Sequence, residues 1–137
     1  LLPSGNNFAY LLAAWSSGSV EAFVARMNEE AAALGMTSTR YVEPSGVDPA
    51  SVSTARDQIR LADAAMADPI FAGIVRAKQA DLPNVGTVFN VNSLLAFDDM
   101  AGVKTGWTEE AGGCFLFASP RPRQSSSSGR ARRSTQT

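Results

Sequence analysis

The chain has 137 residues, 45% of them hydrophobic, and a formal net charge of −1. This is enough for one domain with a hydrophobic core. There is no histidine, and Cys114 is the only cysteine. The composition therefore excludes an internal disulfide, a zinc site of cysteine and histidine, and an imidazole as catalytic base. Acid–base chemistry falls to lysine, carboxylate or tyrosine side chains.

The last residues differ sharply in composition from the rest. Residues 1–118 contain all 13 acidic residues, whereas residues 119–137 contain five of the 12 basic residues and almost nothing apolar. The acidic body argues against a nucleic-acid partner. We interpret residues 119–137 as a disordered, solvated tail. Two alternatives stay open: a basic tail that binds anionic polymers, and a stretch translated out of frame.

The start of the chain does not resemble the start of a complete protein. It opens on Leu1-Leu2-Pro3, with neither an initiator methionine nor a block typical of a signal peptide. No apolar run is long enough to span a membrane. We therefore expect the chain to begin inside a longer protein, with any targeting segment absent from it.

Two helices are predicted in the first 35 residues. Ser4 suits the N-cap of a helix that extends to about Trp15. Apolar residues of this helix share one face, and they are Phe8, Leu11, Leu12 and Trp15. A second helix follows Ser19, since its apolar residues recur at helical spacing, and Gly35 suits its left-handed C-terminal end. Its apolar side chains are expected in the core.

The middle of the chain predicts a short extended segment, a turn and two more helices. Residues 39–42 are the extended candidate, and the prolines and glycine of residues 43–49 forbid regular structure there. Thr54 with Asp57 three residues later resembles a capping box at a helix start. Pro69 suits the first turn of the next helix.

Strands are predicted only toward the C-terminal end. Residues 87–91 alternate like a strand. Residues 103–107 and 114–118 fit a hairpin whose turn lies in residues 109–113. The apolar run 114–118 is typical of a strand buried on both faces. Together the elements predict an α+β domain with a helical region and an incomplete antiparallel sheet.

Lys104 lies between two glycines in Gly102-Val103-Lys104-Thr105-Gly106, in a chain with only one other lysine. A lysine on a strand beside the hydroxyl of Thr105 could bind a carboxylate. The strand amide of Trp107 could donate to an oxyanion, because a ladder fixes it in advance. The alternative is a solvated lysine that protects a sheet edge from pairing.

Several blocks of the sequence resemble a known family. Ser4-Gly5-Asn6 and Lys104-Thr105-Gly106 are similar to the second and third motifs of penicillin-binding proteins and class A β-lactamases, whose first motif is Ser-x-x-Lys. The blocks "LLPSGNN", "FVARMNEEAAALGMTSTRYVEPSGVD", "STARD" and "GVKTGWTEEAGGCFLFAS" closely resemble serine-type D-alanyl-D-alanine carboxypeptidases of low molecular mass. The resemblance covers residues 1–118 and implies part of a β-lactamase/transpeptidase-like domain.

The resemblance also implies roles for single residues. It makes the Ser4 hydroxyl a proton relay, and Asn6 a side chain that orients the lysine partner of the nucleophile and the substrate amide. Lys104 and Thr105 become the anchor for the terminal carboxylate of a D-Ala-D-Ala stem peptide or of a β-lactam. Gly106 gives access to the strand, and the Trp107 amide becomes one of two oxyanion donors.

The implied reaction is acyl transfer through a serine ester, with hydrolysis after loss of the last D-Ala. A lysine serves as base, so the resemblance implies no metal and no cofactor. It implies peptidoglycan stem peptides and β-lactams as partners, and a location outside the cytoplasmic membrane for the parent protein.

The sequence departs from the family at one motif, because no serine has a lysine three residues later. The nucleophile is expected upstream of Leu1, so we expect this chain alone to be inactive. Two alternatives stay open: a fragment of a class A-like β-lactamase, for which Glu43 is a superficial candidate for the deacylating glutamate, and a non-catalytic module that binds peptidoglycan peptides.

Overall fold

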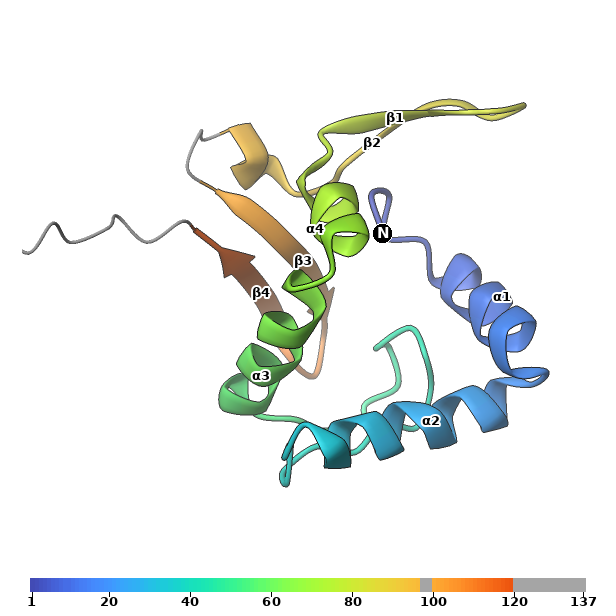
Figure 1. Cartoon of the computed structure of the whole chain (residues 1–137), viewed down its shortest axis with the longest axis vertical. Coiled ribbons are helices and arrows are strands. Elements are labelled where there is room, and N and C mark those ends of the chain that lie inside the picture. Colours follow the sequence, from blue (N-terminus) through green and yellow to red (C-terminus); the bar gives the residue numbers. More distant parts are fainter. Residues whose placement is uncertain (97–99, 120–137) are drawn as a thin grey trace, which may run out of the picture.

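The computed structural model describes residues 1–96 and 100–119. Within them lie four α helices, a 3₁₀ helix and two separate antiparallel hairpins (Figure 1). The elements are α1 (Asn6–Ser17), α2 (Val20–Ala33), α3 (Ala55–Met66), α4 (Pro69–Arg76), β1 (Gln79–Leu82), β2 (Gly86–Phe89), η1 (Ser93–Ala96), β3 (Ala101–Thr108) and β4 (Gly112–Ala118). The predicted α+β class with an incomplete antiparallel sheet is confirmed.

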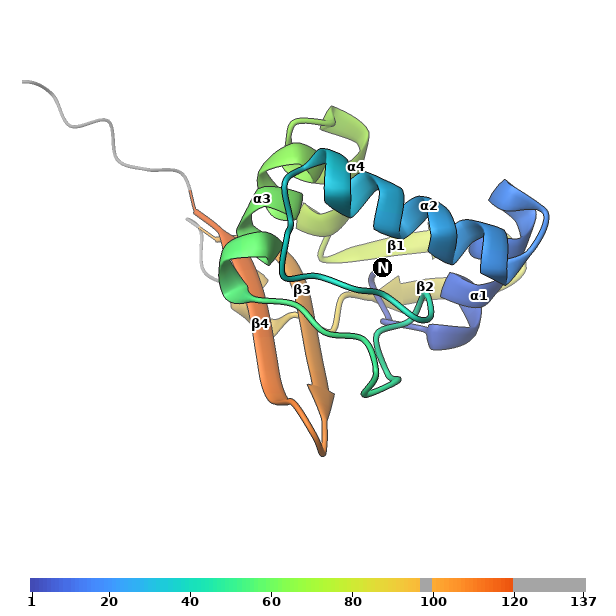
Figure 2. The same cartoon turned by 90° about the horizontal axis from the view of Figure 1, so that it is seen from below.

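The first two helices form one corner of the molecule (Figures 1 and 2). The prediction that Ser4 caps α1 is wrong. The N-cap is Gly5, because Ser4 has a left-handed φ of 52° and turns its hydroxyl elsewhere. Ser19 does cap α2, its side chain accepting a bond from the Ala22 amide at 3.0 Å. Gly35 has the predicted left-handed conformation after the end of α2, with φ 69°.

Helices α3 and α4 begin as their sequences predict. The Thr54 side chain accepts a hydrogen bond from the Asp57 amide at 3.2 Å. The Asp68 side chain caps α4, and Pro69 is its first residue. These two helices contact each other, and α4 also packs against β3. The predicted extended segment 39–42 is reduced to one antiparallel bridge between Arg40 and Val52.

Both hairpins are antiparallel. The predicted strand 87–91 is present as β2, and it pairs with β1, which the sequence did not predict. The predicted hairpin near the C-terminal end is confirmed as β3 and β4, with Thr105 opposite Phe115 and an irregularity between Gly102 and Lys104. The β1–β2 hairpin extends away from the other elements, whereas α3 and α4 lie along the β3–β4 hairpin (Figure 1).

The core is small. Among the described residues, its buried hydrophobic side chains are Leu2, Ala13, Ala31, Met36, Ala72, Val75, Leu95 and Ala101. The expectation that residues 114–118 are buried on both faces is wrong. Phe115 is 40% and Phe117 54% exposed, although their rings stack at a centroid distance of 5.3 Å. Strand β4 pairs with β3 along one edge, and the described residues leave these rings uncovered.

Two further expectations concern a membrane span and the C-terminal tail. No single helix in residues 1–96 and 100–119 has both the length and the apolar character to cross a membrane; only the sharply bent pair α1 and α2 passes that test together. The tail expected at residues 119–137 lies, from residue 120 onward, outside the described part of the chain.

Candidate active site

The two sequence motifs meet through one contact. The Lys104 ammonium donates a hydrogen bond to the Ser4 hydroxyl oxygen at 2.5 Å, across a separation of 100 residues. Ser4 lies just before α1, and Lys104 lies in β3. The contact therefore joins the start of the helical region to the β3–β4 hairpin.

A backbone hydrogen bond holds the N-terminal segment in place for this contact. The Val91 amide donates to the Leu2 carbonyl at 3.0 Å, and the Ser4 amide donates to the Leu1 carbonyl at 3.1 Å. The Leu2 side chain is buried. Ser4 itself has a positive φ, which few residues other than glycine adopt. The turn that results directs Ser4 toward β3 instead of capping α1.

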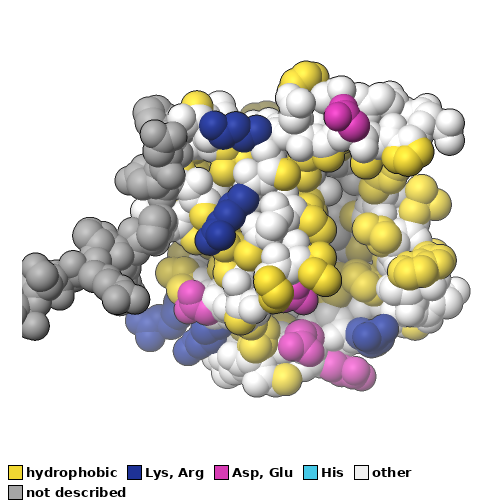
Figure 3. All heavy atoms as spheres, turned by 45° about the horizontal axis from the view of Figure 1, so that its top comes forward, with side chains coloured by type: hydrophobic (Ala, Val, Ile, Leu, Met, Phe, Trp, Pro, Cys, Tyr) yellow, Lys and Arg dark blue, Asp and Glu magenta, His cyan; other side chains and the backbone are white. Residues whose placement is uncertain are grey.

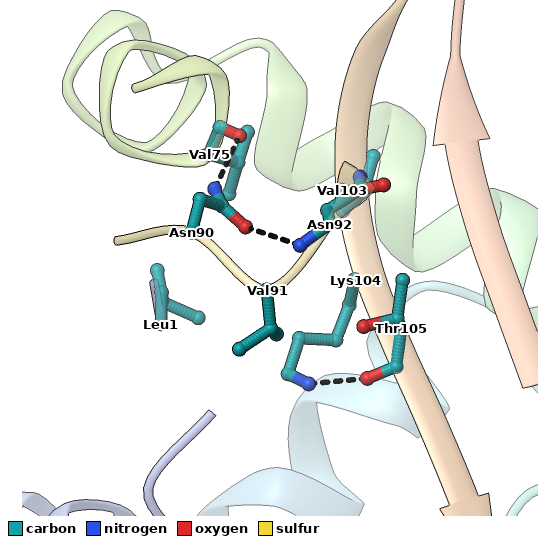
Figure 4. A pocket seen from close by; sticks show the side chains of 8 residues that line it. All are labelled: Leu1, Val75, Asn90, Val91, Asn92, Val103, Lys104 and Thr105. Atoms are coloured by element: carbon teal, nitrogen blue, oxygen red, sulfur yellow. Dashed lines mark hydrogen bonds between the residues drawn. The ribbon is translucent and has the colours of Figure 1, made fainter. Parts of the chain in front are cut away.

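Lys104 is partly withdrawn from water. Burial lowers the pKa of its ammonium. The ammonium also donates to the carbonyl oxygen of Thr105, the next residue (Figure 4). An ammonium carries three N–H donors, so these two bonds leave one donor for a ligand. Because Ser4 accepts from Lys104, its own hydroxyl hydrogen remains free to donate to another group.

The other predicted site residues lie along the same strand or at the start of α1. Thr105 is partly exposed. Gly106 is exposed, and among the described residues outside its chain neighbours no atom lies within 4 Å of the place that a β-carbon would take. Trp107 is 71% exposed. Asn6 is the first residue of α1 and is exposed, and no hydrogen bond of its side chain joins it to the described residues. The structure thus joins Ser4 to Lys104 but does not join Asn6 to either.

A hollow beside Lys104 has walls that the sequence analysis did not anticipate (Figure 4). Its lining consists of Leu1, Val75, Asn90, Val91, Asn92, Val103, Lys104 and Thr105. The Asn90 side chain donates to the Ala77 carbonyl at 3.0 Å and accepts from the Asn92 amide at 3.0 Å. Asn90 thereby ties the end of α4 to the segment that leads into η1. In the sequence, only the two asparagines at the end of the predicted strand 87–91, Asn90 and Asn92, could have indicated these walls.

Asn92 packs directly on the backbone of β3. Its side-chain oxygen accepts from the Leu94 amide at 3.1 Å. Its side-chain nitrogen is buried and finds no acceptor among residues 1–96 and 100–119. A β-carbon on Gly102 would lie 1.8 Å from that nitrogen. Gly102 is therefore required for close approach of Asn92, two residues before Lys104.

Glu43 is already occupied by hydrogen bonds. Its carboxylate accepts from the backbone amides of Ser45, Gly46 and Val47 and from the Tyr10 hydroxyl at 3.2 Å. Burial raises the pKa of this carboxyl, but the hydrogen bonds from Ser45, Asp48 and Gly46 outweigh it and bring the pKa from 4.5 down to about 2. A carboxylate held in this way is a weak base.

The described residues hold no group of three or more Asp, Glu, Cys or His side chains that could bind a metal ion. The polar groups that β3 and Ser4 bring to this site are the Lys104 ammonium, the hydroxyls of Ser4 and Thr105, and the strand amides.

Comparison with known proteins identifies the family of the chain. The family model described as D-alanyl-D-alanine carboxypeptidase matches residues 1–125. D-alanyl-D-alanine carboxypeptidase DacB2 of Mycobacterium tuberculosis is 39% identical over 128 residues, which cover 88% of this chain and 44% of that protein. D-alanyl-D-alanine endopeptidase of Pseudomonas aeruginosa is 39% identical over 124 residues, which cover 85% of this chain and 40% of that protein.

A solved structure extends the likeness to the fold. Penicillin-binding protein D2 of Listeria monocytogenes, in its cefotaxime-bound form, superposes with a TM-score of 0.80 at 31% identity, over 88% of this chain and 51% of that one. The chain thus spans about half, or less, of the length of these relatives. The resemblance noted in the sequence is confirmed: the chain belongs to the D-alanyl-D-alanine carboxypeptidase family.

Proposed function

We propose that this chain is part of a serine-type D-Ala-D-Ala carboxypeptidase that trims peptidoglycan stem peptides. The observation that carries the proposal is the hydrogen bond from Lys104 to Ser4, which joins two family motifs. We assign residues 1–118 to the transpeptidase-like domain and residues 119–137 to a tail.

Lys104 and Thr105 are proposed as the anchor for the terminal carboxylate of the substrate. The ammonium has one N–H donor left after its bonds to Ser4 and Thr105. A carboxylate would accept this donor together with the Thr105 hydroxyl. Lowering of the Lys104 pKa by burial means that this cation is incompletely solvated, so a carboxylate partner would compensate it well.

Ser4 is proposed as the proton relay. Its oxygen accepts from Lys104, and its hydrogen is free to pass to a leaving amine. Asn6 would orient the nucleophile's lysine partner and the substrate amide from the first turn of α1. Gly106 would leave room for substrate beside β3, and the Trp107 amide would donate to the oxyanion.

The covalent step needs a serine that this chain does not contain in a Ser-x-x-Lys motif. That serine would attack the penultimate D-Ala carbonyl, expel the terminal D-Ala with a proton on its amine, and form an ester that water hydrolyses. We therefore expect that the chain alone is not acylated. The parent enzyme would act in the cell envelope, outside the cytoplasmic membrane, on stem peptides and on β-lactams.

The state of Glu43 weighs against the β-lactamase alternative. A deacylating glutamate must accept a proton from water, whereas this carboxylate is committed to backbone amides and has a pKa of about 2. The Glu43 carboxylate instead binds the backbone amides of its own loop.

Titration with an acyl-D-Ala-D-Ala peptide, followed by NMR, tests the anchor. We expect binding to this chain that disappears in Lys104→Ala. Lys78→Ala is the matched control, since Lys78 is exposed and is the only other lysine. Equal binding by both variants would contradict the anchor. Incubation with a labelled penicillin should give no adduct, and a labelled chain would overturn the proposed absence of a nucleophile.

A further inference from the structure

The short segment between β2 and η1 contacts both elements that carry the Ser4–Lys104 pair. The Val91 amide donates to the Leu2 carbonyl at 3.0 Å, and Leu2 lies two residues before Ser4. The next residue, Asn92, packs on β3, the strand that carries Lys104. Val91 and Asn92 also line the hollow beside Lys104 (Figure 4). One segment thus lies between the turn of Ser4 and the strand of Lys104.

Hydrogen bonds fix this segment at both of its asparagines. The Asn90 side chain donates to the Ala77 carbonyl at the end of α4 and accepts from the Asn92 amide, each at 3.0 Å. The Asn92 side-chain oxygen accepts from the Leu94 amide at 3.1 Å. The position of the Asn92 side chain is therefore set by α4 and by the turn into η1, independently of β3.

The side-chain nitrogen of Asn92 faces the backbone of Gly102. Asn92 is 6% exposed, and this nitrogen is buried with no acceptor among the described residues. Buried donors are normally paired, so an exception calls for an explanation in its surroundings. A β-carbon on Gly102 would lie 1.8 Å from the nitrogen and 2.9 Å from the amide carbon of Asn92. Any side chain at position 102 would therefore displace either Asn92 or β3.

Strand β3 is irregular directly after this contact. Between Gly102 and Lys104 it contains one residue more than β4 does opposite, namely Val103. A bulge of this kind bends a strand and changes the direction of the side chains that follow it. The first side chain after the extra residue is that of Lys104, whose ammonium reaches the Ser4 hydroxyl at 2.5 Å. The irregularity therefore lies where it can direct Lys104.

We infer that Asn92 is a positioning residue for the Ser4–Lys104 pair: its side chain packs on Gly102 and fixes the bulge that directs Lys104 toward Ser4. Asn92 acts through β3 and not by contact with a substrate. The geometric part of the inference stands on the contacts alone. Its consequence for ligand binding rests on the proposed function, in which Lys104 anchors a carboxylate.

The small number of lysines makes the contact measurable by NMR. The full chain labelled with ε-¹³C-lysine gives signals from Lys78 and Lys104 only, and Lys78→Ala assigns them. Ser4→Ala removes the hydroxyl that accepts from Lys104, so it should shift the Lys104 signal. This shift, called the Ser4 response, reports whether the two side chains meet. Its absence in the unmodified chain would overturn the inference, since no contact would exist to be positioned.

Asn92→Ser tests the positioning role. Serine keeps a hydroxyl that can accept from the amide two residues on, but it leaves the space beside Gly102 empty. We expect the Ser4 response to be lost in this variant. Asn28→Ser is the matched control, because the Asn28 side chain in α2 also joins distant segments, donating to the Tyr41 carbonyl at 2.8 Å and accepting from its amide at 2.9 Å. This control should lower stability and keep the response. An intact response in Asn92→Ser, or equal loss in both variants, would overturn the inference.

A double variant separates positioning from simple fit. Gly102→Ala should lower the urea midpoint, because its methyl group takes the place of the Asn92 nitrogen. Asn92→Ser in the same chain makes room and should restore the midpoint, but the Ser4 response should stay absent. Return of the response together with the midpoint would overturn the inference, since the two residues would then only need to fit each other.

One measurement needs no variant and holds even if the variants do not fold. In the unmodified chain, nuclear Overhauser effects should connect the side-chain amide protons of Asn92 with the α-protons of Gly102. Their absence would overturn the inference.

Titration with an acyl-D-Ala-D-Ala peptide separates this inference from the proposed function. The peptide should bind Asn92→Ser more weakly than it binds the unmodified chain. If the peptide binds the unmodified chain but the Ser4 response survives in Asn92→Ser, the proposed function stands and the inference fails. If the response is lost in Asn92→Ser but no peptide binds the unmodified chain, the inference stands and the proposed carboxylate anchor fails.

Discussion

The loop between α2 and α3 differs from the outward face of α1, which carries Phe8, Leu11, Leu12 and Trp15. Figure 3 shows hydrophobic side chains gathered on the right-hand side of the molecule, where α1 lies. The difference between the loop and this face lies in whether their side chains find partners among the described residues. The buried carboxylates of Glu43 in the loop and of Asp57 in the first turn of α3, directly after the loop, accept hydrogen bonds from donors close by. Asp57 accepts from the Ser38 amide at 2.9 Å and forms an ion pair with Arg60 at 2.6 Å. The outward face of α1 has no comparable partners among the described residues.

The difference follows from the range of the two interactions. A buried carboxylate can be satisfied by amides a few residues away, so a short segment can complete its own polar network. A row of large apolar side chains needs a second surface, which must come from another element. The Glu43 carboxylate of the loop therefore finds its hydrogen-bond donors within the described residues. The large apolar side chains of α1 find no surface to pack against there.

Replacement of Glu43 tests the completeness of the loop and should have the largest effect. Glu43→Gln turns an NH₂ group toward amides that already donate, and it removes charge-assisted bonds. We expect the free energy of unfolding to fall by about 2 kcal/mol in urea titrations. Glu29→Gln, at an exposed position of α2, is the control and should change little. A loss below about 0.5 kcal/mol for Glu43→Gln would mean that the loop does not depend on this network.

Acid should weaken the same network. The pKa of Glu43 lies at about 2 in the folded chain and at 4.5 without these contacts, so the unfolded chain binds the proton more readily. Its contribution to stability is complete above pH 4.5 and disappears as the pH falls toward 2. Urea midpoints measured across this range should fall less steeply in Glu43→Gln. Some slope should remain, because the pKa of Asp57 is also lowered: burial raises it, and the bonds from Ser38, Thr39 and Arg60 outweigh burial.

Polar replacement on the outward face of α1 should have the smallest effect. Leu12→Ser removes a side chain that is 61% exposed, so we expect the stability of the isolated chain to change by less than about 0.5 kcal/mol. Thermal or urea unfolding measures this. A loss above about 1 kcal/mol would show that the chain already buries this residue and would remove the contrast with the loop.

Local features of the fold could be predicted because they depend on neighbours in sequence. Ser19 and Thr54 cap their helices, and Gly35 adopts the left-handed conformation, because each acts within a few residues. The β3–β4 hairpin could be predicted for the same reason. Strand β1 could not, since Gln79, Ala80 and Asp81 have little β propensity and pair only because β2 lies opposite.

By itself the sequence determined the four helices, the cap of α3 at Thr54, the C-terminal hairpin and the family motifs. Only the tertiary structure decided that Ser4 serves Lys104 rather than α1, that Asn92 lies against Gly102, and that Glu43 closes a loop. Capping and turn formation are set by local geometry, whereas these contacts depend on where distant segments meet. The burial of an apolar face depends on distant segments in the same way. Periodicity identifies such a face on α1, but what packs against it decides whether it is core, surface or interface.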